Sequence, residues 1–447
     1  MIKIYDTMTR SLRDFVPLTE NVVNMYVCGP TVYNYIHIGN ARSAVAFDTI
    51  RRYFEYCGYT VNYISNFTDV DDKIIKAANE AGISTKELSD KFIAAFMEDT
   101  GQLGIKPATQ NPRVINYMDE IIAFVSTLVD KGFAYVSEGD VYFRVAKSNN
   151  YAKLANKTLE DLEIGASGRT DAETERKENP LDFALWKAAK EGEVSWDSPW
   201  GPGRPGWHIE CSVMATEILG DTIDIHGGGA DLEFPHHTNE IAQSEAKTGK
   251  TFANYWMHND FVNVDNEKMS KSLGNFVTVH DMLQTVDGQV LRFFLATQQY
   301  RKPINFTEKA IHDAEVNLKY LKNTHSLPLT EQVNQAELQT YLDAFQEAMD
   351  DDFNTANGVT VLFDMAKWIN SGNYDQTVKD AFEKMLQVFG IVFEEEVLDE
   401  DIEKLIEERQ AARANKDFAT ADRIRDELAA QGIKLLDTKE GVRWTRD

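Results

Sequence analysis

Two runs of β-forming residues on either side of a helical segment constrain the fold of this chain more than any other feature. The first run, Val22–Cys28, alternates in polarity and stops at a Gly-Pro pair, and Thr60–Phe67 has the composition of a second strand. Between them, the apolar spacing of Ala41–Tyr56 predicts a helix that ends at Gly58. A strand, a helix and a strand at this spacing predict a βαβ unit, and therefore an α/β fold with a doubly wound parallel sheet of the Rossmann type.

The carboxyl ends of the strands are the places where such sheets bind ligands. Cys28, Thr31 and Thr68 directly follow the two predicted strands, so we expect them at the binding edge. The sheet is expected to resume near Asp224-Ile225-His226, which would bring a second part of the chain to the same edge.

The rest of the chain separates into regions by composition. A length of 447 residues exceeds what one hydrophobic core usually serves. Helical spacing over Ile311–Leu321, Glu337–Met349 and Thr360–Ile369 predicts a helical bundle. Residues 111–200 mix helix with irregular chain rich in Gly, Pro and Trp, as an insertion would. We therefore predict an α/β domain in two halves (1–110 and 201–305) around an insertion (111–200), then a bundle (306–393) and a small α+β domain (404–447).

The C-terminal tail differs from the rest of the chain in charge. The formal net charge of −26 disfavours a polyanionic partner overall, but local patches decide where nucleic acid binds. Glu408–Asp447 holds nine basic and eight acidic residues, a balance that a solvated helix face would also show. Within it, Ala411–Arg425 is expected to be helical and Gly432–Trp444 β-like. The acidic run Glu394–Glu403 before it has the character of a solvated linker.

Cysteine usage and hydropathy indicate the compartment. Only three cysteines occur, Cys28, Cys57 and Cys211, which argues against a disulfide scaffold and for a reducing environment. The first residues lack a basic segment followed by an apolar run, and no apolar stretch approaches the roughly 20 residues of a membrane span. We therefore expect a cytoplasmic protein with no membrane contact, and the sequence favours a monomer only weakly.

Two segments have the chemistry of a triphosphate site. His37 opens the predicted helix after the first strand, beside the partial positive charge of the helix end. Lys268 and Lys271 lie three residues apart in a loop with Ser and Gly, so both can reach a triphosphate. Such contacts accelerate a reaction only if they strengthen as charge develops at the phosphates. Each segment alone is equally consistent with a helix cap or a surface loop.

A further set of residues has the chemistry of a metal site. Cys28 and Cys211 offer thiolates, and Glu240 lies four residues after His236 and three after His237, so either imidazole can share its face of a helix. Two thiolates, one imidazole and one carboxylate suit zinc. Two buried free cysteines and a charged helix surface are the plainer interpretation.

The order of these motifs resembles the class I aminoacyl-tRNA synthetases. Lys268-Met269-Ser270-Lys271-Ser272 matches the KMSKS signature letter for letter, and His37-Ile38-Gly39-Asn40 resembles the HIGH signature with asparagine in place of the second histidine. The resemblance implies that Lys271 contacts ATP most directly, with His37 and Lys268 as further catalytic residues and Gly39 and Asn40 at the nucleotide.

Within that class, the chain resembles the cysteinyl-tRNA synthetases over essentially its whole length. Their zinc ligands stand before Gly-Pro-Thr, in Trp-His-Ile-Glu-Cys-Ser, and at the first His and the Glu of Pro-His-His-x-x-Glu, which implies Cys28, Cys211, His236 and Glu240 here. Cys57 matches no ligand position and is taken as structural. The resemblance also implies that cysteine is bordered by Thr31, Thr68, Trp207 and His226, and that Gly228 and Asp231 approach the nucleotide.

The family resemblance implies an activity and its partners. L-cysteine would be activated by ATP with Mg²⁺, and the cysteinyl group would pass to the 3′ end of tRNA(Cys), with one zinc ion selecting thiol over hydroxyl. The tail resembles the family's anticodon-binding domain, where Trp444 stacks on a base or packs the domain together.

Two alternatives remain at the level of sequence. One is a related ligase that transfers activated cysteine to an amino-sugar, but that relative lacks the tail. The other is a non-catalytic zinc protein that binds RNA, against which the intact KMSKS loop and His37 argue.

Overall fold

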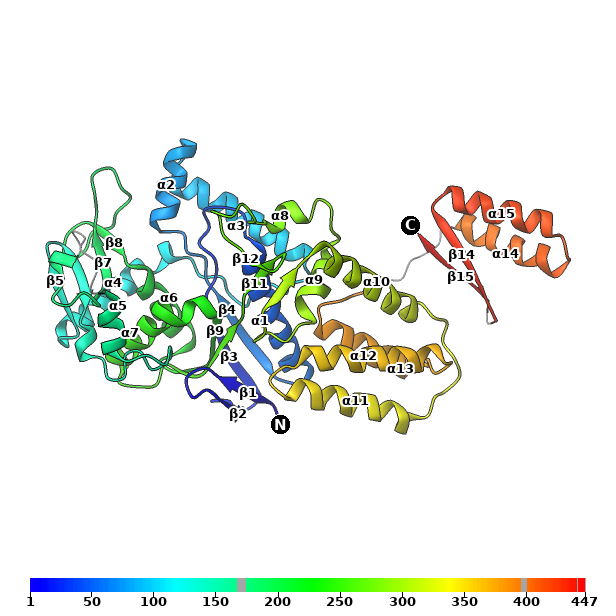
Figure 1. Cartoon of the computed structure of the whole chain (residues 1–447), viewed down its shortest axis with the longest axis horizontal. Coiled ribbons are helices and arrows are strands. Elements are labelled where there is room, and N and C mark those ends of the chain that lie inside the picture. Colours follow the sequence, from blue (N-terminus) through cyan, green and yellow to red (C-terminus); the bar gives the residue numbers. More distant parts are fainter. Residues whose placement is uncertain (167–173, 395–399, 440, 447) are drawn as a thin grey trace.

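A parallel sheet forms the centre of the molecule in a computed structural model that describes residues 1–166, 174–394, 400–439 and 441–446 (Figure 1). Its strand order is β10-β9-β3-β4, and every neighbouring pair is parallel. The strands are β3 (Val22–Val27), β4 (Thr60–Ser65), β9 (Ile223–Gly229) and β10 (Ala253–Asn259). The predicted doubly wound α/β fold is confirmed, with the two halves of the chain joined where β3 pairs with β9.

Helices cover both faces of this sheet because its strands are apolar on both sides. Val23, Met25 and Val27 of β3 belong to one core, and Tyr26 belongs to the other. The first core packs α1 and α9 together, and the second packs α4, α6 and α7. These helices are α1 (Ile38–Tyr56), α9 (Gly288–Ala296), α4 (Met118–Asp130), α6 (Trp207–Leu219) and α7 (Thr238–Thr248).

The helix after the first strand begins earlier than its apolar spacing predicts. His37 is the N-cap of α1: its side chain accepts a hydrogen bond from the Asn40 amide, and the Asn40 side chain accepts one from the His37 amide. This reciprocal capping box satisfies two backbone donors that would otherwise be free, so the helix starts at Ile38 instead of Ala41. The following helices are α2 (Asp72–Ala81) and α3 (Thr85–Gln102).

The inserted region is more ordered than its sequence suggested. It contains a four-stranded antiparallel sheet in the order β5-β6-β7-β8, together with α5 (Leu159–Ala166). The strands are β5 (Ala134–Ser137), β6 (Asp140–Phe143), β7 (Phe183–Ala188) and β8 (Gly203–Pro205). These strands are short and β7 begins 40 residues after β6 ends, so the local sequence does not predict their pairing. β8 extends this sheet past the expected domain boundary at residue 200.

Two small sheets accompany the central sheet. β1 (Lys3–Asp6) pairs with β2 (Ser11–Asp14), and β11 (Val262–Val264) lies between β12 (Glu267–Lys268) and β13 (Ile304–Phe306). The short helix α8 (Val279–Met282) follows.

The helical region contains one helix more than its spacing predicted. It consists of α10 (Glu308–His325), α11 (Gln335–Asp350), α12 (Thr355–Asn370) and α13 (Gln376–Val388). Its turn after α11 is tied to the α/β domain by Asp352, whose buried carboxylate accepts from Tyr5 N at 2.9 Å, from Tyr300 Oη at 2.6 Å and from Arg301 Nε at 2.6 Å. The bundle is therefore fixed to β1 and to the segment that leads into β13.

The C-terminal tail forms a small α+β unit at one end of the molecule (Figure 1). It holds α14 (Glu400–Ala414), α15 (Phe418–Ala430), β14 (Ile433–Thr438) and β15 (Gly441–Arg446). The predicted helical character of Ala411–Arg425 is confirmed except at residues 415–417, where Lys416 takes a φ of 61° and Asp417 caps a new helix. The end of the acidic run belongs to α14, whereas residues 395–399 of that run lie outside the described residues. Among the described residues, no helix combines the length and apolar character that crossing a membrane requires.

Candidate active site

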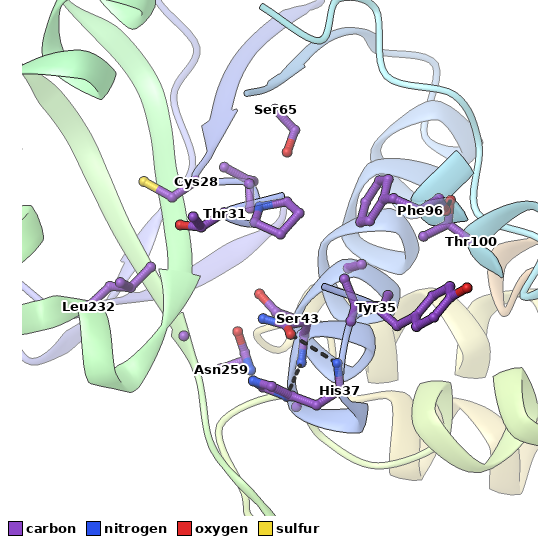
Figure 2. A pocket seen from close by; sticks show the side chains of 18 of the residues that line it. Cys28, Thr31, Tyr35, His37, Ser43, Ser65, Phe96, Thr100, Leu232 and Asn259 are labelled. Atoms are coloured by element: carbon purple, nitrogen blue, oxygen red, sulfur yellow. Dashed lines mark hydrogen bonds between the residues drawn. The ribbon is translucent and has the colours of Figure 1, made fainter. Parts of the chain in front are cut away.

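A cavity of about 690 Å³ opens at the carboxyl ends of β3, β4, β9 and β10 (Figure 2). It is lined by residues from both halves of the α/β domain, as expected for a doubly wound sheet. Most of the predicted contact residues line it: Cys28, Thr31, His37, Gly39, Asn40, Trp207, Asp231, Lys268 and Lys271.

Three residues predicted to touch a ligand instead lie behind the cavity wall. His226 is fully buried and its Nε2 lies 2.9 Å from Glu240 Oε1. Thr68 is buried as well and accepts a hydrogen bond from Asn66 Nδ2 at 3.2 Å. A Cβ on Gly228 would meet Leu232 and His237, so this glycine makes room for packing. All three residues therefore lie behind the residues that line the cavity, and their contact with a ligand stays a prediction.

Gly39 allows His37 to lie over the first turn of α1. A Cβ at position 39 would come within 2.9 Å of the imidazole, which only glycine avoids. The Nδ1 atom of His37 accepts from Asn40 N at 3.2 Å, so the proton of a neutral ring sits on Nε2. Burial, and then Lys271 and Lys73, lower the pKa of His37 to about 4. At neutral pH this side chain is an uncharged hydrogen-bond donor.

The KMSKS loop connects β12 to α8 along the rim of the cavity. Asn275 closes it by accepting from Ser270 N at 2.8 Å and donating to Lys268 O at 3.2 Å. Both lysine side chains are exposed. The ammonium of Lys271 lies 5.6 Å from the ring centroid of Tyr33 and that of Lys268 lies 5.4 Å from the ring of Phe261, within cation–π range.

Lys73 is a further cation at the cavity that the sequence did not single out. It lies in the first turn of α2 and its Nζ is 5.5 Å from the Tyr33 ring. In the sequence it follows an acidic turn and looks like a surface lysine, so no local signal distinguishes it. Asn275 was missed for a related reason, since its role depends on the shape of the loop.

The four predicted metal ligands, Cys28, Cys211, His236 and Glu240, lie close together. Their candidate ligand atoms all lie within 4.8 Å of one another. Cys28 Sγ is 3.7 Å from both Cys211 Sγ and Glu240 Oε2, and His236 Nε2 is 3.3 Å from Glu240 Oε2. Cys28 follows β3, Cys211 lies on α6, and His236 and Glu240 occupy the turn into α7 and its first residues. The third cysteine, Cys57, is exposed at the end of α1.

The donor set matches a metal better than it matches a hydrogen-bonded core. Within the described chain, His236 Nε2 is buried and has no hydrogen-bond partner, while its Nδ1 lies 3.0 Å from His208 Nδ1. Burial raises the pKa of Glu240, and burial together with Cys211 and Glu240 raises the pKa of Cys28 well above its usual value. Buried acidic groups gathered in this way are stabilised by a divalent cation.

A second combination of ligands shares two of these residues. Cys28, His226, His237 and Glu240 also bring their candidate atoms within 4.8 Å of one another. His237 Nδ1 lies 2.8 Å from His258 Nε2, and His258 Nδ1 lies 2.7 Å from Thr7 Oγ1, so this ring is held by a buried network. The geometry alone therefore leaves both His236 and His237 close enough to the cluster to be metal ligands.

Comparisons with known proteins agree with this arrangement. The class I (C) catalytic domain of tRNA synthetases matches residues 14–316, the DALR domain matches 344–394, and the anticodon binding domain of cysteinyl-tRNA ligase matches 395–444. A cysteine–tRNA ligase of Streptococcus thermophilus strain CNRZ 1066 is 95% identical over all 447 residues of both chains. The chain belongs to the cysteinyl-tRNA synthetase family.

Other relatives extend the range of the similarity. A cysteine–tRNA ligase of Streptococcus pyogenes serotype M6 is 84% identical over the full length of both chains. The methionyl-tRNA synthetase of Mycobacterium tuberculosis in complex with methionyl-adenylate superposes with a TM-score of 0.60 at 15% identity, covering 82% of this chain and 89% of that one. This last likeness shows the fold of a class I synthetase.

Proposed function

We propose that this protein is a cysteine–tRNA ligase that activates L-cysteine with ATP and transfers the cysteinyl group to the 3′ end of tRNA(Cys). The observation that carries the proposal is one cavity lined by His37 and the KMSKS lysines at one side and, at the other, by Cys28, whose ligand atom clusters with those of Cys211, His236 and Glu240. A triphosphate and a thiol-bearing amino acid can therefore meet between them.

His37 and the lysines act on the phosphates in the first reaction. The cysteine carboxylate attacks the α-phosphate of ATP, and pyrophosphate leaves in line. Lys271 and Lys268 neutralise negative charge as it grows on the departing phosphates, and the neutral His37 donates from Nε2. Mg²⁺ is expected on the phosphates.

The cluster beside Cys28 would hold one zinc ion, with Cys28, Cys211, His236 and Glu240 as ligands. When bound, the ion supplies affinity for the substrate thiolate over the hydroxyl of serine, a distinction that an apolar pocket makes only modestly. Trp207 stacks on His236 with ring centroids 4.1 Å apart, so the indole covers the cluster and borders the substrate.

The exposed carboxylate of Asp231 is suited to the ribose of the nucleotide. A Cβ on Gly229 would come within 2.4 Å of Asp231 Oδ1, so the glycine leaves this carboxylate room at the end of β9. A carboxylate there can accept from the two ribose hydroxyls. No side chain of the cavity stands out as a general base for transfer, and positioning of the terminal tRNA hydroxyl carries that step.

The C-terminal unit would read the anticodon. Leu435 and Trp444 face each other across β14 and β15 and pack against a core that includes Ile424 and Leu428. Packing is therefore the better supported role for Trp444, and the charged residues of α14 and α15 are the more suitable contacts for phosphates.

The test of this function is pyrophosphate exchange with the purified protein. Cysteine-dependent exchange into ATP, with serine inactive, is the expected result, followed by charging of tRNA(Cys) and no transfer to an amino-sugar acceptor. Exchange without any tRNA charging would favour the amino-sugar ligase, and absence of exchange with bound RNA would favour the non-catalytic zinc protein.

A further inference from the structure

The two signature segments are bonded to each other through their backbones. Ile38 N donates to Val277 O at 3.1 Å, and Val279 N donates to Ile36 O at 2.9 Å, on either side of the bridge between His37 and Thr278. The arm that returns from the KMSKS loop therefore runs beside the turn that carries His37. It enters α8 at once, and His280 lies in the first turn of this helix.

Side chains reinforce that pairing at a point next to the cavity. The ring of Tyr35 stacks on the ring of His280 with centroids 4.2 Å apart and planes 13° apart. The same tyrosine meets the edge of Phe92 at 5.2 Å, and it lines the cavity beside His37 (Figure 2). Tyr35 is thus held between α3 and α8.

His280 also connects α8 to a buried carboxylate of α3. Its Nδ1 lies 3.1 Å from Asp99 Oδ1, and Asp99 is only 1% exposed. Within the described residues the other oxygen, Asp99 Oδ2, has no hydrogen-bond partner, so His280 provides the hydrogen bond of this carboxylate. Because an unpaired buried carboxylate is costly, Asp99 holds the imidazole in place.

We propose that Tyr35, His280 and Asp99 form a brace that holds the KMSKS loop in register with His37 during adenylate formation. His280 and Asp99 lie outside the cavity lining and are positioning residues. The inference rests on the proposed function, and it assigns a role to three side chains that the reaction does not otherwise use.

The loop needs such a support because its lysines have few contacts of their own. Lys268 and Lys271 are exposed and, within the described chain, make no ion pair within 4.0 Å, so the backbone of the loop sets their positions. One end of the loop is fixed where β12 pairs with β11, and the brace fixes the other end through α8. A displacement of about 1 Å at a charge-stabilising group is enough to slow a reaction strongly.

Substitution of His280 tests the brace with ATP–pyrophosphate exchange as the readout. His280→Leu should lower kcat about tenfold, with the KM for cysteine within about twofold of the unmodified protein. His280→Arg should retain kcat within about threefold, because a planar cation still stacks on Tyr35 and pairs with Asp99. His312→Leu, at an exposed position of α10, is the matched control and should leave kcat unchanged.

A second variant keeps the test valid if His280→Leu does not fold. Tyr35→Ala leaves the pair of His280 and Asp99 in place and should lower kcat by a similar factor. The kcat of the double variant Tyr35→Ala/His280→Leu should lie within about twofold of that of the slower single variant, because both substitutions remove the same contact.

Several results would overturn the brace while leaving the function intact. These are an unchanged kcat in His280→Leu or in a folded Tyr35→Ala, an equal loss in the Leu and Arg variants, or losses that multiply in the double variant. If the unmodified protein shows no cysteine-dependent exchange, the proposed function is wrong and the brace is rejected with it.

Discussion

The two sides of the cavity are built in opposite ways. On the side of Cys28, the candidate metal ligands Cys211, His236 and Glu240 are at most 1% exposed, and the rings of His208, His226 and Trp256 pack around them. On the side of the KMSKS loop, Lys268 and Lys271 are exposed. Selection of a thiol needs ligands held at fixed distances, and burial supplies that rigidity. Charge that develops only in the transition state is met better by groups that engage late, which an exposed loop permits.

The largest loss of activity is expected when a candidate ligand of the buried metal cluster is replaced. Cys211→Ser removes a thiolate from the proposed zinc centre and should lower cysteine-dependent exchange by at least about 10³-fold, with the zinc content of the purified protein falling from about one per chain toward zero. Zinc content is measured by elemental analysis alongside exchange. The exposed Cys57 offers a matched control, and Cys57→Ser should change neither quantity. Full activity of rigorously metal-free protein would rule out this account of thiol selection.

Replacing a lysine of the exposed KMSKS loop should instead slow catalysis without affecting the selection of cysteine. Lys271→Ala should lower kcat for exchange by about 10²-fold, because one charge-stabilising contact in the transition state is lost, and the KM for cysteine should stay nearly constant. Steady-state exchange kinetics separate the two constants. Lys309→Ala, on the outer surface of α10, is the control and should behave like the unmodified protein. A raised KM for cysteine at unchanged kcat would show that the loop acts in substrate binding.

The contrast between the two sides also explains what the sequence could predict. The strands and α1 follow from apolar spacing. Cys28, Cys211, His236 and Glu240 are candidate metal ligands through their resemblance to family motifs, and the structure brings their ligand atoms into one cluster. The geometry behind them does not follow. His226 is part of a conspicuous glycine-rich motif, yet its Nε2 lies 2.9 Å from Glu240 Oε1 and its ring stacks on Trp256. Both contacts depend on how α7 and β10 pack against β9, which the motif does not encode.

Short strands and loop contacts were missed for the same physical reason. The antiparallel sheet of the insertion pairs β6 with β7 across 39 intervening residues, so neither strand carries enough local signal. In the tail, Lys416 takes a left-handed conformation and interrupts a continuous helical pattern. Such a conformation usually falls on glycine, and position 416 has none, so the sequence did not predict the break. Lys73 and Asn275 acquire roles only when the loops are folded over the cavity.

A smaller effect is expected when His208, which contacts the candidate metal ligand His236, is replaced. The Nδ1 atoms of His208 and His236 lie 3.0 Å apart, and burial lowers the pKa of His208 to about 3, so both rings are neutral. If Nε2 of His236 binds the proposed zinc ion, Nδ1 of this ring carries the proton and donates to His208 Nδ1. His208→Ala should weaken zinc affinity about 10- to 100-fold in a chelator competition assay, while kcat at saturating zinc changes little. Equal zinc affinity in the variant would favour His237 as the ligand, and His312→Ala is the control.

The smallest effect concerns the protonation of His37. Its pKa is lowered from 6.5 to about 4, so the ring is neutral between pH 5 and 8 and kcat for exchange should show no inflection near pH 6.5 from this residue. The folded state binds this proton less readily than the unfolded state. The contribution of the neutral His37 ring to the free energy of unfolding is therefore complete above about pH 6.5 and is lost as pH falls toward 4.

Substitution distinguishes a donor from a cation at this position. His37→Gln keeps an N–H near the position of Nε2 and should retain a kcat about tenfold higher than that of His37→Ala, with both variants equally flat in pH between 5 and 8. Exchange rates at saturating cysteine and ATP give the comparison. An inflection near pH 6.5 in the unmodified protein that disappears in His37→Gln would mean that the imidazolium is the active form. In that case His37 would add a third positive charge to those of Lys268 and Lys271, whereas the buried imidazoles of His208 and His236 stay neutral.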